Sequence, residues 1–251
     1  RVREITDVLL DKVGDGEFDV MKALALPLPT AVICEMMGVP AEDRLTFTQW
    51  TDDMTLFLLG NLATEQQQAR AGVAIGNMTE YLTARIQERK NSPGDDLISV
   101  LVQAEDDDQL SHMELLWQCM GLILAGFETT TGLIGNGVRQ MLLHPDQIAR
   151  LQKDPDLIES AVEECLRYDP PIPGTARFLH EEAEFGGYLI PVNTRINAIL
   201  AAANRDPTRF PDPDRFDPDR TDNRHLGFGG GLHYCVGAPL ARIEAEGALV
   251  S

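Results

Sequence analysis

The first two thirds of the chain repeat a pattern of apolar residues at helical spacing, with recognisable start and stop signals. After Thr30, which can cap a helix, apolar residues recur three and four positions apart until Gly38 and Pro40 end the segment. A second run of helical character spans 66–89. We therefore expect residues 1–168 to be mainly helical.

The longest predicted helix lies in the middle of the chain. It begins at Ser111, where Glu114 three residues later completes a capping box. It extends to His144, because Pro145 disfavours a helical conformation in the residue before it. A further helix is expected over 155–168.

An acidic cluster separates two of the predicted helices. Asp95 or Asp96 starts the helix before it, and the cluster itself runs from Glu105 to Asp108. Neither a histidine nor a wider carboxylate pattern accompanies the cluster, so we interpret it as a solvated loop rather than a metal site.

The pattern changes after residue 168. Between 183 and 200, β-branched and apolar residues flank the pair Gly186 and Gly187, which predicts short strands in a hairpin. Four prolines in 204–220 exclude regular structure there, and the segment is expected to be ordered only if its arginines have partners. The predicted fold class is mainly α with a small β part.

Composition and charge restrict the possible functions. The chain has 251 residues, 43% of them hydrophobic, and a formal net charge of −19, which disfavours nucleic acid and anionic membranes as partners. The longest apolar stretch, 120–127, is too short to span a membrane. Four cysteines lie far apart, without a C-x-x-C pair, which indicates a reducing compartment. They are Cys34, Cys119, Cys165 and Cys235.

The stretch GFGGGLHYCVG, residues 227–237, surrounds Cys235 with glycines. A cysteine thiolate is a strong ligand for iron, and it needs backbone N–H groups nearby with no side chains in the way. Two alternatives stay open for the residue alone. Cys235 could be a small buried apolar residue, or it could hold zinc with His233, although further zinc ligands at usable spacing are missing.

The whole pattern F-G-x-G-x-H-x-C-x-G resembles the haem-binding loop of the cytochrome P-450 family. The resemblance implies haem b (iron protoporphyrin IX) as cofactor, with Cys235 as the axial iron ligand. Phe228 would shield the sulfur from water, and the helix expected from Ala238 would favour the thiolate. The glycines assigned to cofactor binding are Gly229, Gly231 and Gly237.

A second motif supports the same resemblance. LAGFETTTG in the long helix is similar to the family's oxygen-binding motif, through Ala125, Gly126, Glu128 and Thr129. Small residues at the first two positions would leave room for the cofactor and O2. The resemblance gives Thr129 and Glu128 the catalytic role of relaying protons to bound oxygen.

Further residues match the family's structural and propionate-binding positions. Glu164 and Arg167 in EECLR match E-x-x-R, and Arg220 stands where a third member of their network is expected. Arg177 and His233 are expected to face the haem propionates, with a solvated strand residue as the alternative for Arg177.

The resemblance covers essentially the whole chain and predicts one partial cytochrome P-450 domain over 1–251. It implies a long central helix over the haem and the cysteine-ligand loop beneath it. The domain would comprise a helical region (1–168), a strand and meander region (169–224), and the haem loop with the start of the last core helix (225–251). The family's N-terminal part and extreme C-terminal part would be missing.

The implied function is that of a bacterial-type haem-thiolate monooxygenase. It would insert one oxygen atom from O2 into a small or medium, largely apolar organic substrate, with residues 118–121 and 171–176 bordering the substrate space. Electrons would come from a ferredoxin or similar carrier with its NAD(P)H-dependent reductase, in the cytoplasm. Alternatives are a peroxide-using haem-thiolate enzyme and a non-catalytic haem-binding or inactive truncated relative.

Overall fold

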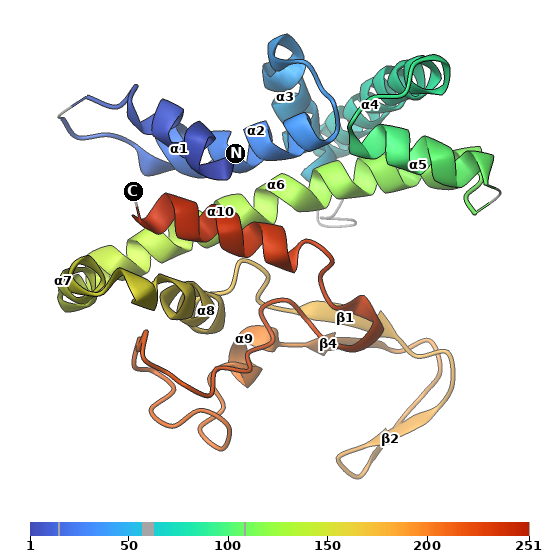
Figure 1. Cartoon of the computed structure of the whole chain (residues 1–251). Helices are drawn as coiled ribbons and strands as arrows, with labels where there is room; N and C mark the ends of the chain where they lie inside the picture. Colours follow the sequence, from blue (N-terminus) through green and yellow to red (C-terminus); the bar gives the residue numbers. More distant parts are fainter. Residues whose placement is uncertain (15, 57–62, 108, 251) are drawn as a thin grey trace. The chain divides into compact units, whose positions relative to one another are not determined.

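The computed structural model describes residues 1–14, 16–56, 63–107 and 109–250. The chain divides into two compact units, Arg1–Thr131 and Gly132–Ser251, and the boundary falls inside the long helix α6. Figure 1 shows the elements of both units, each of which is treated below by itself. The single domain expected from the sequence, with internal limits at 168 and 224, stays a prediction.

The first unit is helical in its described part. Hydrogen-bonded caps start three of its helices: Thr64 and Gln67 form a capping box, Asp96 caps with its carboxylate, and Ser111 pairs with Glu114. The expected starts at Asp96 and Ser111 are thereby confirmed. The helices are α1 (Val2–Leu10), α2 (Pro27–Met36), α3 (Arg44–Thr55), α4 (Glu65–Asn91), α5 (Leu97–Asp106) and α6 (His112–Leu143).

The core of this unit forms where α4 and α6 present apolar stripes. On α4 the buried positions repeat every three or four residues, which places them on one face of the helix. They are Ala71, Ala74, Met78, Leu82 and Ile86. On α6 the buried side chains of this cluster are Leu115, Leu116, Cys119, Met120, Ile123 and Phe127.

The second unit combines helices with two small antiparallel sheets. Strand β1 (Thr175–Phe178) pairs with β4 (Arg195–Ala198), and β2 (Ala183–Phe185) pairs with β3 (Tyr188–Ile190). Its helices after α6 are α7 (Pro145–Lys153), α8 (Ile158–Tyr168), the short α9 (Leu200–Ala203) and α10 (Ala238–Val250). Helix α8 packs against α10, and both contribute to the core of the unit.

The expected hairpin is confirmed between β2 and β3. Gly186 and Gly187 connect the strands with φ of 59° and 82°, a region that residues with a Cβ rarely adopt. Asn193, in the turn before β4, has φ of 64°, which asparagine tolerates better than most other residues. The Gly186–Gly187 turn places Phe185 opposite Tyr188, which sets the register of β2 and β3.

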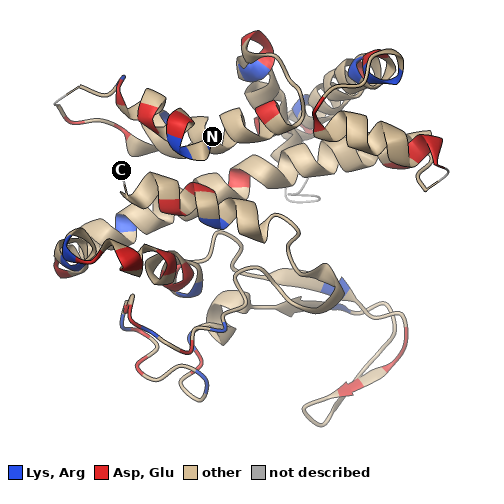
Figure 2. Ribbon diagram, in the orientation of Figure 1, with Lys and Arg blue, Asp and Glu red and all other residues tan. Residues whose placement is uncertain are grey.

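The proline-rich segment after α9 is irregular and ordered by ion pairs. Figure 2 shows acidic and basic residues alternating along it. Arg205 pairs with Asp214 at 2.7 Å, and Arg209 makes two hydrogen bonds of 2.9 Å with Asp222. Arginines of this segment therefore have acidic partners, which was the condition for the segment to be ordered.

Two predictions from the sequence were wrong. Thr30 does not start α2: it lies inside the helix, and its hydroxyl donates to the Leu26 carbonyl at 2.7 Å. The acidic cluster is not simply a solvated loop, because Glu105 belongs to α5, pairs with Lys90 at 2.7 Å and contacts His112. Asp108, the end of the cluster, lies outside the described residues.

The four cysteines are free, three of them buried and Cys235 exposed. Across the described ranges, every helix is too short or too polar to cross a lipid bilayer.

Candidate functional site

The E-x-x-R residues form a buried ion pair on α8. Arg167 donates to both carboxylate oxygens of Glu164, from Nε at 2.7 Å and from NH2 at 2.8 Å, and both side chains are fully buried. A spacing of three residues puts them on one face of the helix. A fork-shaped donor meeting a planar carboxylate is a strong, geometrically specific pair.

Arg167 also holds the irregular segment that follows α9. Its NH1 donates to the carbonyls of Asn204 (2.9 Å) and Pro213 (2.8 Å), and its NH2 donates to that of Arg215 (3.0 Å). Arg220 lies with Nε 3.4 Å from Glu164 Oε2, so the structure brings together the three side chains of the expected network. Its members fix a loop by satisfying buried carbonyls.

A neighbouring carboxylate, Glu163, forms a second network that the sequence did not single out. Arg242 on α10 donates to it from Nε at 2.6 Å and NH2 at 3.0 Å, and His225 Nε2 lies 3.0 Å from Glu163 Oε2. Burial alone would raise the pKa of Glu163, but the hydrogen bonds from His225 and Arg242 outweigh it and lower the pKa to about 2.

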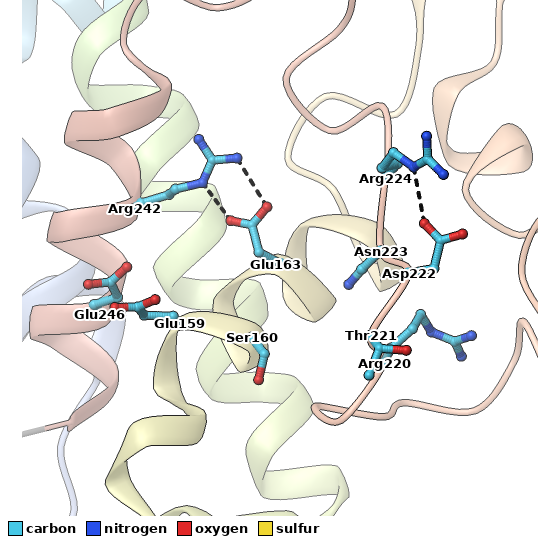
Figure 3. Close-up of a pocket in the computed structure, with 10 residues that line it drawn as sticks. All are labelled: Glu159, Ser160, Glu163, Arg220, Thr221, Asp222, Asn223, Arg224, Arg242 and Glu246. Atoms are coloured by element: carbon cyan, nitrogen blue, oxygen red, sulfur yellow. Dashed lines mark hydrogen bonds and ion pairs between the residues drawn. The ribbon is translucent and has the colours of Figure 1, made fainter.

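Figure 3 shows Glu163 and Arg242 reaching toward each other from two helices, at the wall of a pocket of about 610 Å³. Charges of both signs line the rest of that wall, including Arg224, Asp222 and Glu246. A mixed lining of this kind suits water and ions better than an apolar ligand.

The glycine-rich residues between His225 and α10 form a tight loop, here called the Cys235 loop (225–237). The backbone N–H of Cys235 donates to the Phe228 carbonyl at 3.1 Å, and α10 begins three residues later. Gly229 and Gly231 have φ of 71° and 64°, so a side chain at either position would strain the backbone. The glycines are therefore conformational requirements of the loop.

The surface around Cys235 fits a flat apolar group. The thiol is exposed, and its neighbours Leu232 and Val236 are 102% and 86% exposed although both are apolar. A Cβ added at Gly230 or Gly231 would meet no atom within 4 Å, so this face of the loop borders open space. A soft thiolate is one of the donors that hold haem iron, and an apolar rim suits the macrocycle around it.

The zinc alternative for Cys235 finds no support in the part of the chain that the structure describes. No group of three or more His, Cys, Asp or Glu side chains there is arranged to hold a metal ion. A single cysteine ligand is compatible with haem, in which the macrocycle supplies the other donors.

In the first unit, the A-G-x-E-T segment lies on α6. The hydroxyl of Thr129 donates a hydrogen bond to the Ala125 carbonyl at 2.9 Å. Its oxygen lone pairs can still accept a hydrogen bond. Ala125 is exposed, and its role in leaving room for the cofactor stays a prediction. Gly126 has a different reason to be small, because a Cβ there would lie 2.9 Å from Ile33 Cδ1 on α2.

Glu128 lies on the same helix, next to Thr129. Although the residue is largely solvent-exposed, neighbouring atoms desolvate its carboxyl group and raise its pKa. The negative charge of Asp52 on α3 raises it further. Both effects favour a carboxyl group that holds its proton closer to neutral pH, which suits a proton donor.

The two residues expected at the propionates are both exposed in the second unit. Arg177 on β1 donates to the Thr175 hydroxyl and to the Ala176 carbonyl, each at 2.8 Å. His233 ends a short 3₁₀ turn, Gly231–His233, in the Cys235 loop. The guanidinium of Arg177 and the imidazole of His233 are therefore accessible to an anionic partner. That they bind the haem propionates stays a prediction.

The structure thus brings together Glu164, Arg167 and Arg220, and separately frames Cys235 with its glycines. The residues of the A-G-x-E-T segment belong to the other unit. Sequence reasoning missed Glu163, His225 and Arg242, because one carboxylate beside E-x-x-R and one arginine in a helix carry no signal alone. The doubled glutamate in EECLR was the only hint.

Comparisons with known proteins identify the family of the chain. The Cytochrome P-450 family model matches residues 42–251. The chain is 43% identical over 252 residues to 6-deoxyerythronolide B hydroxylase of Saccharopolyspora erythraea, covering 99% of this chain and 61% of that protein. It is 44% identical over 252 residues to the cytochrome P-450 monooxygenase PikC of Streptomyces venezuelae, covering 98% and 59%.

A solved structure gives the same result for the fold. The crystal structure of P450BioI in complex with an acyl carrier protein ligated to hexadec-9Z-enoic acid matches with a TM-score of 0.93 and 38% identity, covering 98% of this chain and 64% of that one. The chain spans about three fifths of the length of the curated relatives it matches. Because the family model spans most of the residues and the relatives match nearly all of them, the chain belongs to the cytochrome P-450 family.

Proposed function

We propose that the protein works as a haem-thiolate monooxygenase, inserting one oxygen atom from O2 into a small or medium, largely apolar organic molecule. Haem b is the cofactor of the cytochrome P-450 family. Two of the relatives are named as a hydroxylase and a monooxygenase. Because the chain covers only part of their length, activity, substrate and partners are inferred for the whole protein.

The Cys235 loop is the observation that carries the proposal. It offers an exposed thiol between exposed apolar side chains, on a backbone whose positive φ at Gly229 and Gly231 favours glycine. Phe228 anchors the loop by accepting the Cys235 N–H. An exposed apolar rim around a potential metal ligand is costly in water and is expected where a prosthetic group covers it.

The residues of the second unit would hold the haem and the backbone around it. Cys235 would ligate the iron, while Arg177 and His233 would neutralise the carboxylates of the haem. When bound, the haem supplies the activation of O2. Arg167, Glu164 and Arg220 would act only by keeping the neighbouring backbone rigid, since both members of the central pair are fully buried.

Proton delivery is assigned to the two residues on α6. In the structure the Thr129 hydroxyl donates to the Ala125 carbonyl, which leaves its oxygen able to accept a hydrogen bond from a water or an acid. To pass a proton on, the hydroxyl would turn its hydrogen from that carbonyl toward the bound oxygen while its lone pair takes a proton from the acid. Glu128, with its raised pKa, would hold the proton that is relayed. The proposed partners are a ferredoxin-type carrier and its NAD(P)H-dependent reductase, and the proposed location is the cytoplasm.

The direct test is a carbon monoxide difference spectrum of the reduced, haem-loaded protein. The parent should give a thiolate-type band, and Cys235→Ser should lose it while retaining some bound haem. Cys34→Ala removes a buried cysteine of the other unit and serves as the control, which should keep the band. A thiolate-type band that persists in Cys235→Ser, or is absent from the parent, would refute the assignment.

Electron supply separates this function from a peroxide-using enzyme and from a non-catalytic haem protein. With a ferredoxin, its reductase and NAD(P)H, the proposed enzyme should oxidise an apolar test substrate in proportion to O2 consumed. Product with hydrogen peroxide but none with the reductase system would favour the peroxide-using alternative. Haem binding with product under neither condition would favour the non-catalytic one.

A further inference from the structure

One carboxylate in the second unit accepts hydrogen bonds from residues on both sides of the Cys235 loop. Glu163 on α8 contacts His225, at the start of the loop, and Arg242, on the helix that follows the loop. The side chain of His225 is 3% exposed, and those of Glu163 and Arg242 are 28% and 30% exposed. The three groups are therefore at least partly withdrawn from solvent.

The hydrogen bonds of His225 define its tautomer. The backbone N–H of Gly227 donates to His225 Nδ1 at 3.0 Å, so Nδ1 must be an acceptor. The proton is then on Nε2, which donates to Glu163 Oε2 at 3.0 Å. The imidazole thus links the carboxylate directly to the backbone of the loop.

A second connection runs through α10. The guanidinium of Arg242 lies 4.6 Å from the ring centroid of Phe228, a cation–π arrangement. The carbonyl of Phe228 accepts the backbone N–H of Cys235 at 3.1 Å. Glu163 holds the Arg242 guanidinium with two hydrogen bonds, and Arg242 in turn covers the residue that anchors Cys235.

We propose that Glu163 is a positioning residue for Cys235, acting through His225 on the start of the loop and through Arg242 and Phe228 on the cysteine itself. The inference rests on the proposed function, in which Cys235 ligates haem iron. A carboxylate is required because it only accepts hydrogen bonds: an amide would turn an NH2 group toward one of the two donors.

The first test needs no haem. Backbone amide hydrogen exchange is measured by mass spectrometry on peptides covering 226–238, in the parent and in Glu163→Gln. We expect exchange in this segment to be faster by about tenfold or more, since hydrogen bonds to a charged group are lost. The hairpin 183–190, in the same unit, should exchange as in the parent.

Glu159→Gln is the matched control. Glu159 lies one turn earlier on α8 and lines the same pocket, as Figure 3 shows. Among the described residues, no hydrogen bond or ion pair joins it to His225 or Arg242, so the variant removes the same charge without touching the network. Equal exchange of 226–238 in Glu163→Gln and Glu159→Gln would overturn the proposal.

The second test uses the haem-loaded protein. Glu163→Gln should convert from the thiolate-type to the non-thiolate carbon monoxide band several times faster than the parent, whereas Glu163→Asp, which keeps the charge, should lie between them. Arg242→Gln should behave like Glu163→Gln, and it replaces that variant if Glu163→Gln does not fold. Parent-like band stability in both variants would contradict the positioning role. A missing thiolate-type band in the parent would instead reject the proposed function, and the exchange result would still stand.

Discussion

At the scale of single residues, the local surroundings determine how Thr129 on α6 and Glu244 on α10 can bind or release protons. The hydroxyl of Thr129 donates to the Ala125 carbonyl, and its oxygen can accept a hydrogen bond. The neighbouring residue Glu128 has a carboxyl group whose pKa is raised. Glu244 on α10 is 1% exposed, and its Oε2 has no hydrogen-bond partner among the described residues. Both residues lead to a measurable expectation.

Thr129→Ala should separate electron use from product formation. Without the hydroxyl, protons would reach oxygen by a less ordered route, and product formed per NAD(P)H should fall on the order of tenfold. Both quantities are measured in the same reaction with the reductase system. Thr131→Ala removes a hydroxyl two residues further along α6 and should leave the ratio unchanged. A parent-like ratio in Thr129→Ala would exclude the proton role.

Glu244 should make stability depend on pH. Burial raises its pKa to about 8, so between the unfolded value of about 4.3 and pH 8 the folded state keeps a proton that the unfolded state releases. Its contribution is full below the unfolded value and is lost as the pH rises toward 8, with a slope of at most about 1.4 kcal/mol per pH unit.

Glu244→Gln should remove that slope, because the amide stays neutral at every pH. Urea denaturation at pH 5 and pH 8 should show the variant gaining stability over the parent as the pH rises. Glu181→Gln, at an exposed position of the same unit, is the control and should follow the parent. The same stability difference between Glu244→Gln and parent at both pH values would contradict the raised pKa.

At the scale of elements, helix α6 contains glycines with opposite surroundings. A Cβ added at Gly121 would meet no atom within 4 Å, so this glycine borders open space. Gly126 packs against Ile33 of α2, and a Cβ added there would lie 2.9 Å from Ile33 Cδ1. A glycine in a helix costs about 1 kcal/mol relative to alanine, so a glycine at a helix contact is retained only where the neighbour leaves no room. The sequence alone suggested space for O2 at Gly126, and the packing supplies a different reason.

The two glycines should respond to alanine in opposite directions. Gly121→Ala should stabilise the protein by about 1 kcal/mol through helix propensity. Gly126→Ala gains the same propensity but overpacks the contact at a cost of about 1–3 kcal/mol, so we expect no gain or a net loss. A Cβ at Gly126 would lie 2.9 Å from Ile33 Cδ1 and 3.0 Å from Ile33 Cγ1. Ile33→Val removes the first of these atoms and should partly relieve Gly126→Ala. Equal stabilisation by both alanine variants would contradict the close packing.

At the scale of the whole molecule, buried charge holds together segments far apart in sequence. Arg167 joins α8 to carbonyls at residues 204, 213 and 215, and Glu164 accepts the backbone N–H of Asp217 at 2.8 Å. The prolines of the irregular segment prevent a ladder of backbone hydrogen bonds, so its order rests on these contacts together with the exposed ion pairs of Arg205 and Arg209. The order of the second unit therefore depends strongly on one guanidinium.

Arg167→Lys should destabilise the second unit by about 3–5 kcal/mol, because an ammonium cannot reproduce the fork and leaves a buried carboxylate partly unpaired. The measurement is circular dichroism during urea denaturation. Both tryptophans, Trp50 and Trp117, belong to the first unit, so their fluorescence reports that unit separately.

Arg139→Lys is the control for Arg167→Lys. Arg139 is 63% exposed and pairs with Asp169 at 3.2 Å, so its replacement should cost less than about 1 kcal/mol. A small effect of Arg167→Lys, similar to that of Arg139→Lys, would show that the buried network is dispensable.

The sequence by itself determined the family, the helices with local start and stop signals, the turn at Gly186 and Gly187, and the glycine-framed cysteine. These features depend on residues close together in the chain, where capping, periodicity and backbone freedom operate. Thr30 was misplaced because a threonine inside a helix can bond to the carbonyl four residues earlier, and its sequence context looks like a cap.

Only the tertiary structure decided which distant groups meet. The contacts between Glu163, His225 and Arg242 span 62 and 79 positions of the chain, and no local pattern encodes them. The same holds for the packing of Gly126 on Ile33 and for the burial that raises the pKa of Glu244. Contact and desolvation arise from folding in three dimensions, so the support of Cys235 became visible only with the fold.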